Sequence, residues 1–148
     1  MKISGNNKGM TLVEVMMSIM ILVPLFAGVM IGYVKCIEYN DLSGNTSAAT
    51  LAVQNRITEI ENTPFSQILA TYDDTTFTVP GLDGIGVSYV DDSVDNILNV
   101  KTVFSWRERN GRVIGEDVNQ NGQWDAGEDT MAVNNELDSI VQLTTIIR

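Results

Sequence analysis

The chain has 148 residues, with 9 Lys and Arg against 19 Asp and Glu and no histidine, so its formal charge is −10. This length fits one compact domain and does not fit two. Without histidine, mechanisms that need an imidazole base or an imidazole metal ligand are excluded, among them Ser-His-Asp hydrolysis and most zinc catalysis. Net acidity with basic residues scattered along the chain also argues against direct nucleic-acid binding. We therefore expect neither an enzyme nor a nucleic-acid-binding protein.

The apolar residues gather near the N-terminus. Residues 15–34 are a run of 20 without one charge, and a helix of that length spans about 30 Å, the thickness of a bilayer core. A buried core helix is the alternative, but the rest of the chain is too short and too polar to enclose a helix that is apolar all round. The sequence therefore predicts a membrane-spanning helix.

The residues before the apolar run indicate its orientation in the membrane, and they include one acid, Glu14. The short polar leader carries Lys2 and Lys8, which favours an N-terminus inside the cell. Residues 33–36 lack the small residues of a secretory cleavage site. Glu14 stands at the start of the run, and a carboxylate within lipid costs about 2.5–3.5 kcal/mol near the helix centre. Glu14 therefore needs a cationic partner.

The segment GMTLVEV at residues 9–15, followed by the apolar run, resembles the leader and N-terminal helix of the type IV pilin superfamily, which comprises pilus subunits and the pseudopilins of type II secretion. The resemblance implies that a prepilin peptidase cleaves after Gly9 and methylates Met10 as the new first residue, where the family more often has phenylalanine. It also implies that Glu14 pairs with the N-terminal ammonium of a neighbouring subunit. Such a pair would neutralise two groups that lipid penalises separately. An ordinary signal anchor is the alternative.

The helical pattern continues beyond the apolar run. Glu59 and Glu61 fall on the outward side of a stripe of apolar residues spaced four, four and three apart: Ala49, Val53, Ile57 and Ile60. Pro64 ends the pattern, so a helix over residues 10–62 would be roughly 80 Å long. Pro24 should kink or locally unwind it. Residues 48–65 also resemble the corresponding region of minor pilins and minor pseudopilins.

From residue 71 onward, β-branched and aromatic residues alternate with turn residues, which predicts strands at residues 77–79, 87–90, 99–106 and 140–147. In the third of these, one face carries Val100, Thr102, Phe104 and Trp106 and the other carries Lys101, Val103 and Ser105. This strand and the last one resemble the closing hairpin of minor pilin heads, without the paired cysteines of many major pilins. We expect an α+β fold, in which the second half of a long N-terminal helix packs on a small antiparallel sheet.

These patterns divide the chain into four parts. The resemblance implies that residues 1–9 are a prepilin leader and that residues 10–34 are the transmembrane and filament-core helix. Residues 35–64 form the amphipathic second half of the helix, and residues 65–148 form a β-rich head that includes an acidic loop at residues 117–128.

The acidic loop satisfies the calcium pattern D-x-[DN]-x-[DN]-G-x5-E and resembles the loops of EF-hand and dockerin modules. The expected oxygen donors are Asp117, Asn119, Asn121, the backbone carbonyl of Gln123, Asp125 and Glu128. Glu116 and Asp129 add negative charge, so the loop should repel itself without a cation. Its flanks at residues 112–114 and 131–133 look like strand ends, which places the loop in the last hairpin. The alternative is that the loop is a solvated turn that binds no metal. The acidic pairs Asp73-Asp74 and Asp91-Asp92 are interpreted as solvated turns.

Together the patterns favour a minor type IV pilin or pseudopilin with a structural calcium ion. It would lie in the cytoplasmic membrane as a single pass with an extracytoplasmic head, and then in a periplasmic or cell-surface filament. Its partners would be other pilin or pseudopilin subunits, the prepilin peptidase and membrane lipid. A calcium-dependent adhesive or substrate-binding module on a membrane-anchored stalk is the alternative.

Overall fold

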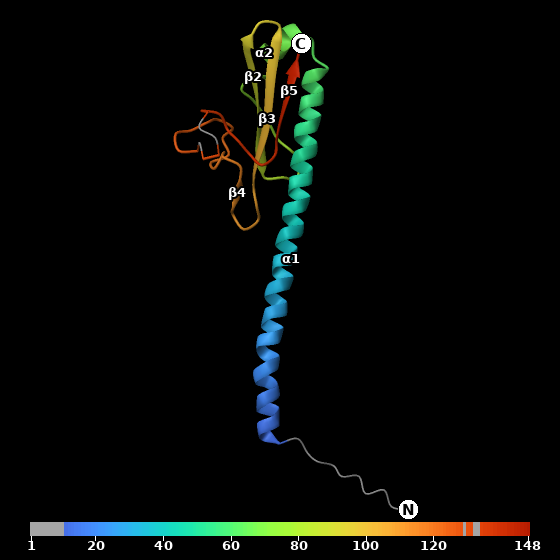
Figure 1. Cartoon of the computed structure of the whole chain (residues 1–148), viewed down its shortest axis with the longest axis vertical. Coiled ribbons are helices and arrows are strands. Elements are labelled where there is room, and N and C mark those ends of the chain that lie inside the picture. The colour runs from blue at the N-terminus through green and yellow to red at the C-terminus, as the bar shows by residue number, and fades with distance from the viewer. Residues whose placement is uncertain (1–10, 129, 132–133) are drawn as a thin grey trace, which may run out of the picture. The chain divides into compact units, whose positions relative to one another are not determined.

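The computed structural model describes residues 11–128, 130–131 and 134–148. It has an α+β fold, as the sequence predicted, with one long N-terminal helix and a small antiparallel sheet (Figure 1). The elements in chain order are α1 (Leu12–Glu61), α2 (Phe65–Tyr72), β1 (Thr75–Phe77), β2 (Gly84–Val94), β3 (Ile97–Arg107), β4 (Val113–Ile114) and β5 (Gln142–Ile147). The chain divides into two compact units, Met1–Asp41 and Leu42–Arg148. We call the second of these the head unit.

The part of α1 in the first unit is a regular helix whose side chains are exposed. Phe26 and Ile31, for example, are 58% and 65% exposed. The helix continues without a break through Pro24, so the local unwinding considered for this position is absent. A proline removes one backbone donor from a helix, and the helical conformation continues on both sides of Pro24.

The part of α1 in the head unit packs on the sheet through the predicted stripe. The buried residues of α1 are Ala49, Val53, Ile57 and Ile60, which confirms the prediction residue by residue. Ala49 and Val53 lie in one apolar cluster with Phe104 and Trp106 of β3. The other two join a second cluster with residues of α2, β2 and β3, namely Ile68, Tyr72, Val90, Leu98 and Val100. Glu59 and Glu61 are exposed, as expected.

The sheet is antiparallel, with β2 between β1 and β3. The other edge of β3 carries two strands one after the other, since β5 pairs with residues 98–103 and β4 with residues 106–107. The acidic loop lies in the connection between β4 and β5. These two strands pair with β3 and not with each other, so the expectation of a loop within a hairpin is wrong. Residues 113–114 form the expected strand end, whereas Met131 lies outside a strand and residues 132–133 lie outside the described residues.

The two faces of β3 carry the residues that its alternation predicted, and both faces are covered. Val100, Phe104 and Trp106 face α1. On the opposite face, Val103 packs with Val87 of β2 and with Leu137, which belongs to the connection before β5. The β4–β5 connection therefore acts as a second layer over the sheet.

Helix α2 was missed by the sequence analysis, which ended the helical region at Pro64. The proline occupies the N-cap position of α2 with a φ of −54°, so it separates two helices. Ile68 and Tyr72 are its buried residues. A helix of eight residues gives only two turns of periodicity, which is too little to distinguish it from a loop by pattern alone.

Candidate functional site

Glu14 lies in the first turn of α1, where it forms two reciprocal contacts with Thr11. The backbone N–H of Thr11 donates to Oε2 of Glu14 at 3.4 Å, and the backbone N–H of Glu14 donates to Oγ1 of Thr11 at 3.3 Å. This is a capping box, which satisfies free amides at the start of a helix. Glu14 therefore has a local role in the helix that its T-x-x-E spacing could have revealed. Gly9 and Met10, the residues of the expected cleavage, lie outside the described residues.

Among the described residues, α1 is the one helix long and apolar enough to cross a membrane. Its most apolar 18-residue window has a mean hydropathy of 2.4, and none of that window is buried. Membrane spans and N-terminal signal sequences share this length and composition. Glu14 is the acid that directly precedes the uncharged run at residues 15–34.

The acidic loop begins with a fully buried carboxylate. Asp117 is 1% exposed, its Oδ1 accepts the backbone N–H of Asn121 at 3.1 Å, and its Oδ2 accepts that of Gly122 at 2.9 Å. These bonds draw the chain into a tight turn, in which Gly122 has a φ of +72°. A Cβ on Gly122 would lie 2.5 Å from Cγ2 of Thr76 in β1. Glycine is therefore required both by the turn and by the contact of the loop with the sheet.

Three of the expected ligands converge on one point. Nδ2 of Asn119 and Nδ2 of Asn121 both donate to Oδ2 of Asp125, each at 2.8 Å. A half-turn of either carboxamide would bring its oxygen to the same place. The structure therefore gathers the side chains of the third, fifth and ninth loop positions around one carboxylate oxygen.

Glu128, the last residue of the loop, bonds back to its first residues and to Asp125. Glu128 is 7% exposed, and its Oε1 accepts the backbone N–H groups of Val118 at 2.9 Å and Asn119 at 3.3 Å. Its Oε2 accepts the backbone N–H of Asp125 at 3.3 Å. Gln123 is exposed, and its backbone N–H donates to Oδ1 of Asn121 at 2.7 Å. The carboxylate of Glu128 thus holds the end of the loop next to its beginning.

The chemistry of these donors fits calcium, which takes six to eight oxygen ligands from carboxylates, amides and backbone carbonyls. Acidic and thiol side chains alone do not form a metal-holding group of three or more anywhere in the part of the chain that the structure describes. A cation held by the loop would therefore use the amide oxygens of Asn119 and Asn121 and a backbone carbonyl together with the carboxylates.

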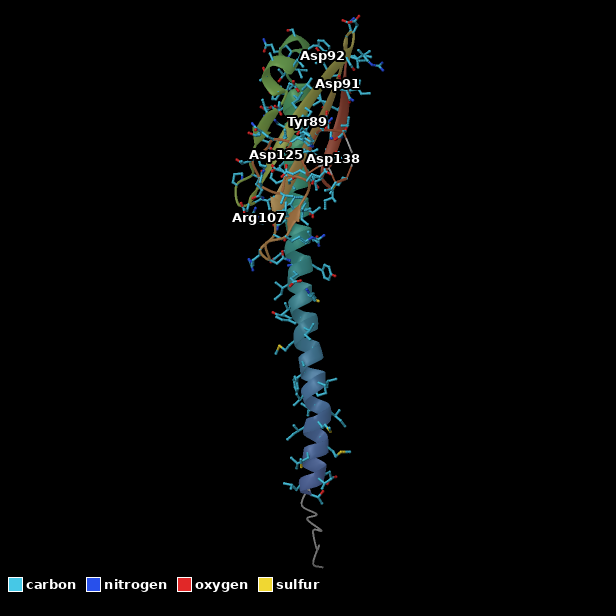
Figure 2. All side chains as sticks on the ribbon, turned by 90° about the vertical axis from the view of Figure 1, so that its left-hand side faces the viewer. Tyr89, Asp91, Asp92, Arg107, Asp125 and Asp138 are labelled. Atoms are coloured by element: carbon cyan, nitrogen blue, oxygen red, sulfur yellow. The ribbon has the colours of Figure 1, made fainter. Side chains whose placement is uncertain are left out.

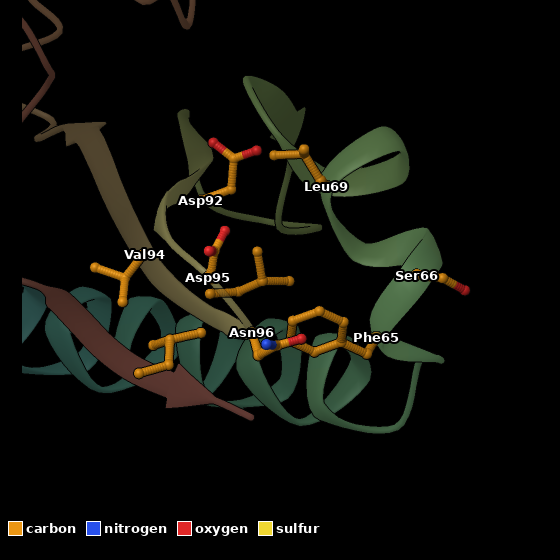
Figure 3. A pocket seen from close by; sticks show the side chains of 9 residues that line it. Phe65, Ser66, Leu69, Asp92, Val94, Asp95 and Asn96 are labelled. Atoms are coloured by element: carbon orange, nitrogen blue, oxygen red, sulfur yellow. The ribbon is translucent and has the colours of Figure 1, made fainter.

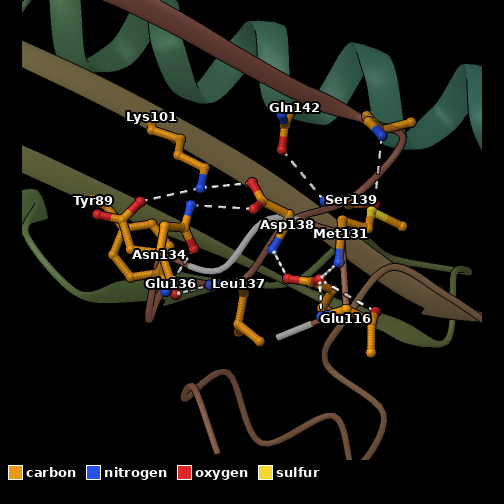
Figure 4. Close-up of polar contacts among 12 residues, drawn as sticks. Tyr89, Lys101, Glu116, Met131, Asn134, Glu136, Leu137, Asp138, Ser139 and Gln142 are labelled. Atoms are coloured by element: carbon orange, nitrogen blue, oxygen red, sulfur yellow. Dashed lines mark hydrogen bonds and ion pairs between the residues drawn. The ribbon is translucent and has the colours of Figure 1, made fainter. Parts of the chain in front are cut away.

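Glu116, which directly precedes the loop, is buried and bonds to other parts of the chain. It is 1% exposed, and Figure 4 shows its carboxylate surrounded by donors. Oε1 accepts the backbone N–H of Thr130 at 2.5 Å and that of Met131, and Oε2 accepts the backbone N–H of Asp138 at 2.9 Å. The backbone N–H of Glu116 donates in turn to the carbonyl of Asp138 at 2.9 Å. Glu116 therefore fastens the two ends of the β4–β5 connection, a role without a sequence signal. Asp129, the other expected neighbour, lies outside the described residues.

A second polar cluster attaches the same connection to the sheet (Figure 4). Nζ of Lys101 lies 2.7 Å from Oδ1 of Asp138 and 3.1 Å from Oε2 of Glu136, and the hydroxyl of Tyr89 accepts the backbone N–H of Leu137 at 3.2 Å. Burial lowers the pKa of Lys101, but hydrogen bonds and ion pairs with Asp138 and Glu136 outweigh it, so the pKa lies above its usual value of 10.5. Burial raises the pKa of Tyr89 to about 12.

The acidic pairs Asp73-Asp74 and Asp91-Asp92, which were interpreted as solvated turns, include residues with structural roles. Asp73 caps the C-terminal end of α2, and its Oδ1 accepts the backbone N–H of Val90 at 2.9 Å. Asp91 and Asp92 lie within β2, close to its turn into β3. Asp73 therefore joins α2 to the sheet, which is a structural role.

Comparison of the chain with models of known families, with curated proteins and with solved structures found no match.

Proposed function

We propose that this chain is a minor type IV pilin or pseudopilin, a structural, non-catalytic subunit of a filament anchored in the cytoplasmic membrane. The observation that carries the proposal is the exposed, uncharged stretch of α1 directly preceded by one acid, Glu14. An apolar helix surface of this kind is stable in lipid or against equivalent helices of other subunits. The α+β layout of the chain is consistent with the proposal.

Glu14 would select the position of each subunit by pairing with a positive charge on its neighbour. Cleavage after Gly9 creates an ammonium group on Met10 next to the membrane. The proposal places this pairing between chains, where it can set the position of each subunit against the next. The two charges together are less costly in lipid than each alone.

The mass of the mature protein tests this proposal. In cells with an active prepilin peptidase, we expect a chain that starts at methylated Met10, detected by intact mass and by sequencing of the N-terminal peptide. The same gene in cells that lack the peptidase is the control, and there the leader should remain. A chain that keeps residues 1–9 while the peptidase processes other substrates would reduce the proposal to an anchored extracytoplasmic domain.

The acidic loop suggests a structural calcium ion as part of the proposal. Asp117 and Glu128 already shape the turn, and Asn119, Asn121 and Asp125 converge above it. Calcium is available outside the cytoplasm at the millimolar concentrations that suit weak extracellular sites. The ion would add its binding free energy to the packing of the β4–β5 connection on the sheet.

The same loop favours a second candidate, a calcium-dependent adhesive or substrate-binding module displayed on the membrane-anchored helix. The two functions differ in a measurement on cells. An adhesive module predicts that attachment to a surface or substrate depends on calcium and is lost in Asp125→Asn while filaments still form. A structural ion predicts that the same variant changes only the stability of the head unit.

A further inference from the structure

A groove of about 280 Å³ lies at the end of the head unit where α2 meets the turn between β2 and β3. Phe65 and Leu69 of α2 form its apolar side, and both are more than a third exposed, at 39% and 37%. Figure 3 shows Asp92 and Asp95 of the opposite side facing these two residues. The groove thus combines an apolar wall with two carboxylates.

The backbone explains why the two carboxylates reach the groove. Between the pairs Asp91 with Asn99 and Val94 with Ile97, the register shifts because β2 has one residue more than β3. Such a bulge turns a side chain such as that of Asp92 away from the regular alternation of a strand, and Asp95 lies in the turn that follows β2. Asp92 and Asp95 are exposed and have no hydrogen-bond or ion-pair partner among the described residues.

The opposite end of β3 carries a cluster of the opposite charge. Arg107 ends β3, Arg109 and Arg112 lie in the β3–β4 turn that follows, and all three are exposed. They are half of the basic residues of the head unit. Glu108, the acid of the turn, is engaged with the head unit itself, since its Oε1 accepts the indole N–H of Trp106 at 2.5 Å. The turn therefore presents mainly positive charge.

The two clusters are separated by the length of one strand. β3 has 11 residues, which corresponds to about 35 Å. Figure 2 shows Asp91 and Asp92 at one end of the sheet and Arg107 at the other. One head unit thus carries an acidic groove and a basic turn at opposite ends.

We propose that the acidic groove of one copy receives the basic turn of a second copy, so that head units join end to end. The guanidinium group of Arg112 would lie between the carboxylates of Asp92 and Asp95, where planar, charge-assisted hydrogen bonds can form. The aliphatic part of the arginine would lie on Phe65 and Leu69, which covers apolar surface that is otherwise exposed.

The contact uses different surfaces on the two copies, so it leaves one groove and one turn open at the ends of every chain of heads. Heterologous contacts of this kind produce rings or open filaments. Between membrane-anchored chains, contacts of this kind would join the subunits of one filament. In the cell the inference therefore rests on the proposed function, whereas in detergent micelles it does not.

Disulfide cross-linking of the purified full chain in detergent tests the contact. In a Cys36→Ser background, Ser66→Cys places a thiol beside the groove and Asn110→Cys places one in the basic turn. We expect no covalent dimer from either single variant, dimers from an equal mixture of the two, and a ladder of higher species from the double variant. Dimers from one single variant alone would show an isologous contact and overturn the proposal, as would the absence of dimers in the mixture.

Charge reversal separates this contact from chance collisions. Asp95→Lys or Arg112→Glu in the double-cysteine chain should reduce the ladder about three- to fivefold, and the two reversals together should restore it. The ladder should also weaken as the salt rises from about 0.05 M to about 0.5 M. If charge reversal leaves the ladder unchanged, the proposal is wrong. The tryptophan emission of each variant checks that the head unit is folded. Cross-links in detergent judge the head contact, whereas the N-terminal mass judges the filament, so the two can fail separately.

Discussion

Nζ of Lys101 lies 2.7 Å from Oδ1 of Asp138, and this ion pair joins the middle strand of the sheet to the connection that covers it. Asp138 is 5% exposed, so removal of the lysine charge leaves a carboxylate with little access to water. We expect Lys101→Met to lower the free energy of unfolding by about 1 kcal/mol at neutral pH. Urea unfolding followed by tryptophan emission measures the change, and an equal stability of both proteins would contradict it.

The same region predicts a loss of stability at alkaline pH. Lys101 and Tyr89 both have a raised pKa, that of Tyr89 at about 12, so the folded state holds their protons more tightly than the unfolded state does. Their contribution is complete below the ordinary values near 10 and is lost as the pH rises through the folded values. The free energy of unfolding should therefore fall between about pH 9.5 and about pH 12. Lys101→Met should show a smaller fall, and a rise in stability over this range would contradict the argument.

Glu116→Gln tests the buried carboxylate that fastens the β4–β5 connection. Glutamine has one oxygen where glutamate has two, and its NH₂ group would face backbone N–H donors. We expect a loss of about 3 kcal/mol in the free energy of unfolding. Glu136→Gln, a change of the same kind at a side chain that is 40% exposed, is the matched control and should cost well under 1 kcal/mol. Equal losses in the two variants would show that Glu116 has no special role.

Gly86→Ala tests the packing between β1 and β2. Gly86 stands opposite Phe77, and an added Cβ would lie 2.2 Å from the phenylalanine ring. We expect this variant to lose about 1–3 kcal/mol through overpacking. Phe77→Leu should recover part of the loss in the double variant, which a double-mutant cycle of unfolding measurements would detect. Additive losses would show that the ring is not the cause.

Two variants of Glu14 separate its role within the helix from its proposed role between subunits. Glu14→Gln keeps a side chain that can complete the capping box but removes the charge, whereas Thr11→Ala removes the threonine oxygen and keeps the charge. If the charge pair positions subunits, Glu14→Gln should prevent incorporation into filaments and Thr11→Ala should leave it nearly normal. Sheared filament fractions probed by immunoblotting give the readout, and membrane fractions show that insertion is unchanged. The reverse pattern would assign Glu14 to capping alone.

Trp124 allows calcium binding to be measured directly. It is next to Asp125 in the loop and is partly exposed, whereas Trp106, the second tryptophan, is fully buried. We expect Tb³⁺ emission sensitised by Trp124, and its displacement by calcium with a dissociation constant of about 10⁻⁴–10⁻³ M. Asp125→Asn should weaken the affinity at least about tenfold, and Asp91→Asn is the control outside the loop. Trp124→Phe should abolish the emission while calcium still raises the melting temperature. If the protein shows no sensitised Tb³⁺ emission and no thermal shift at millimolar calcium, the calcium proposal is wrong.

The parts of the fold that the sequence predicted are those in which one periodicity extends over many residues. The stripe from Ala49 to Ile60 and the two faces of β3 were correct because each repeats several times with a clear contrast in polarity. α2 and β4 are too short to repeat. For Glu116 the sequence analysis predicted only added negative charge beside the acidic loop, because its hydrogen-bond partners are 14 to 22 positions further on. The arginines of the β3–β4 turn were counted as scattered, because their separation from the acids at the other end of the sheet depends on the length of β3 and not on their own spacing.

Glu116 and Asp138 exchange two hydrogen bonds at the base of the β4–β5 connection, so the chain leaves the sheet and returns to it at one place. The ends of this excursion are fixed whatever lies between them. Lengthening such a closed excursion costs only about 0.6 kcal/mol for each doubling of its length. The exposed residues between the two ends can therefore be exchanged or extended at low cost, whereas Gly122 and Leu137, which contact the sheet, have to stay.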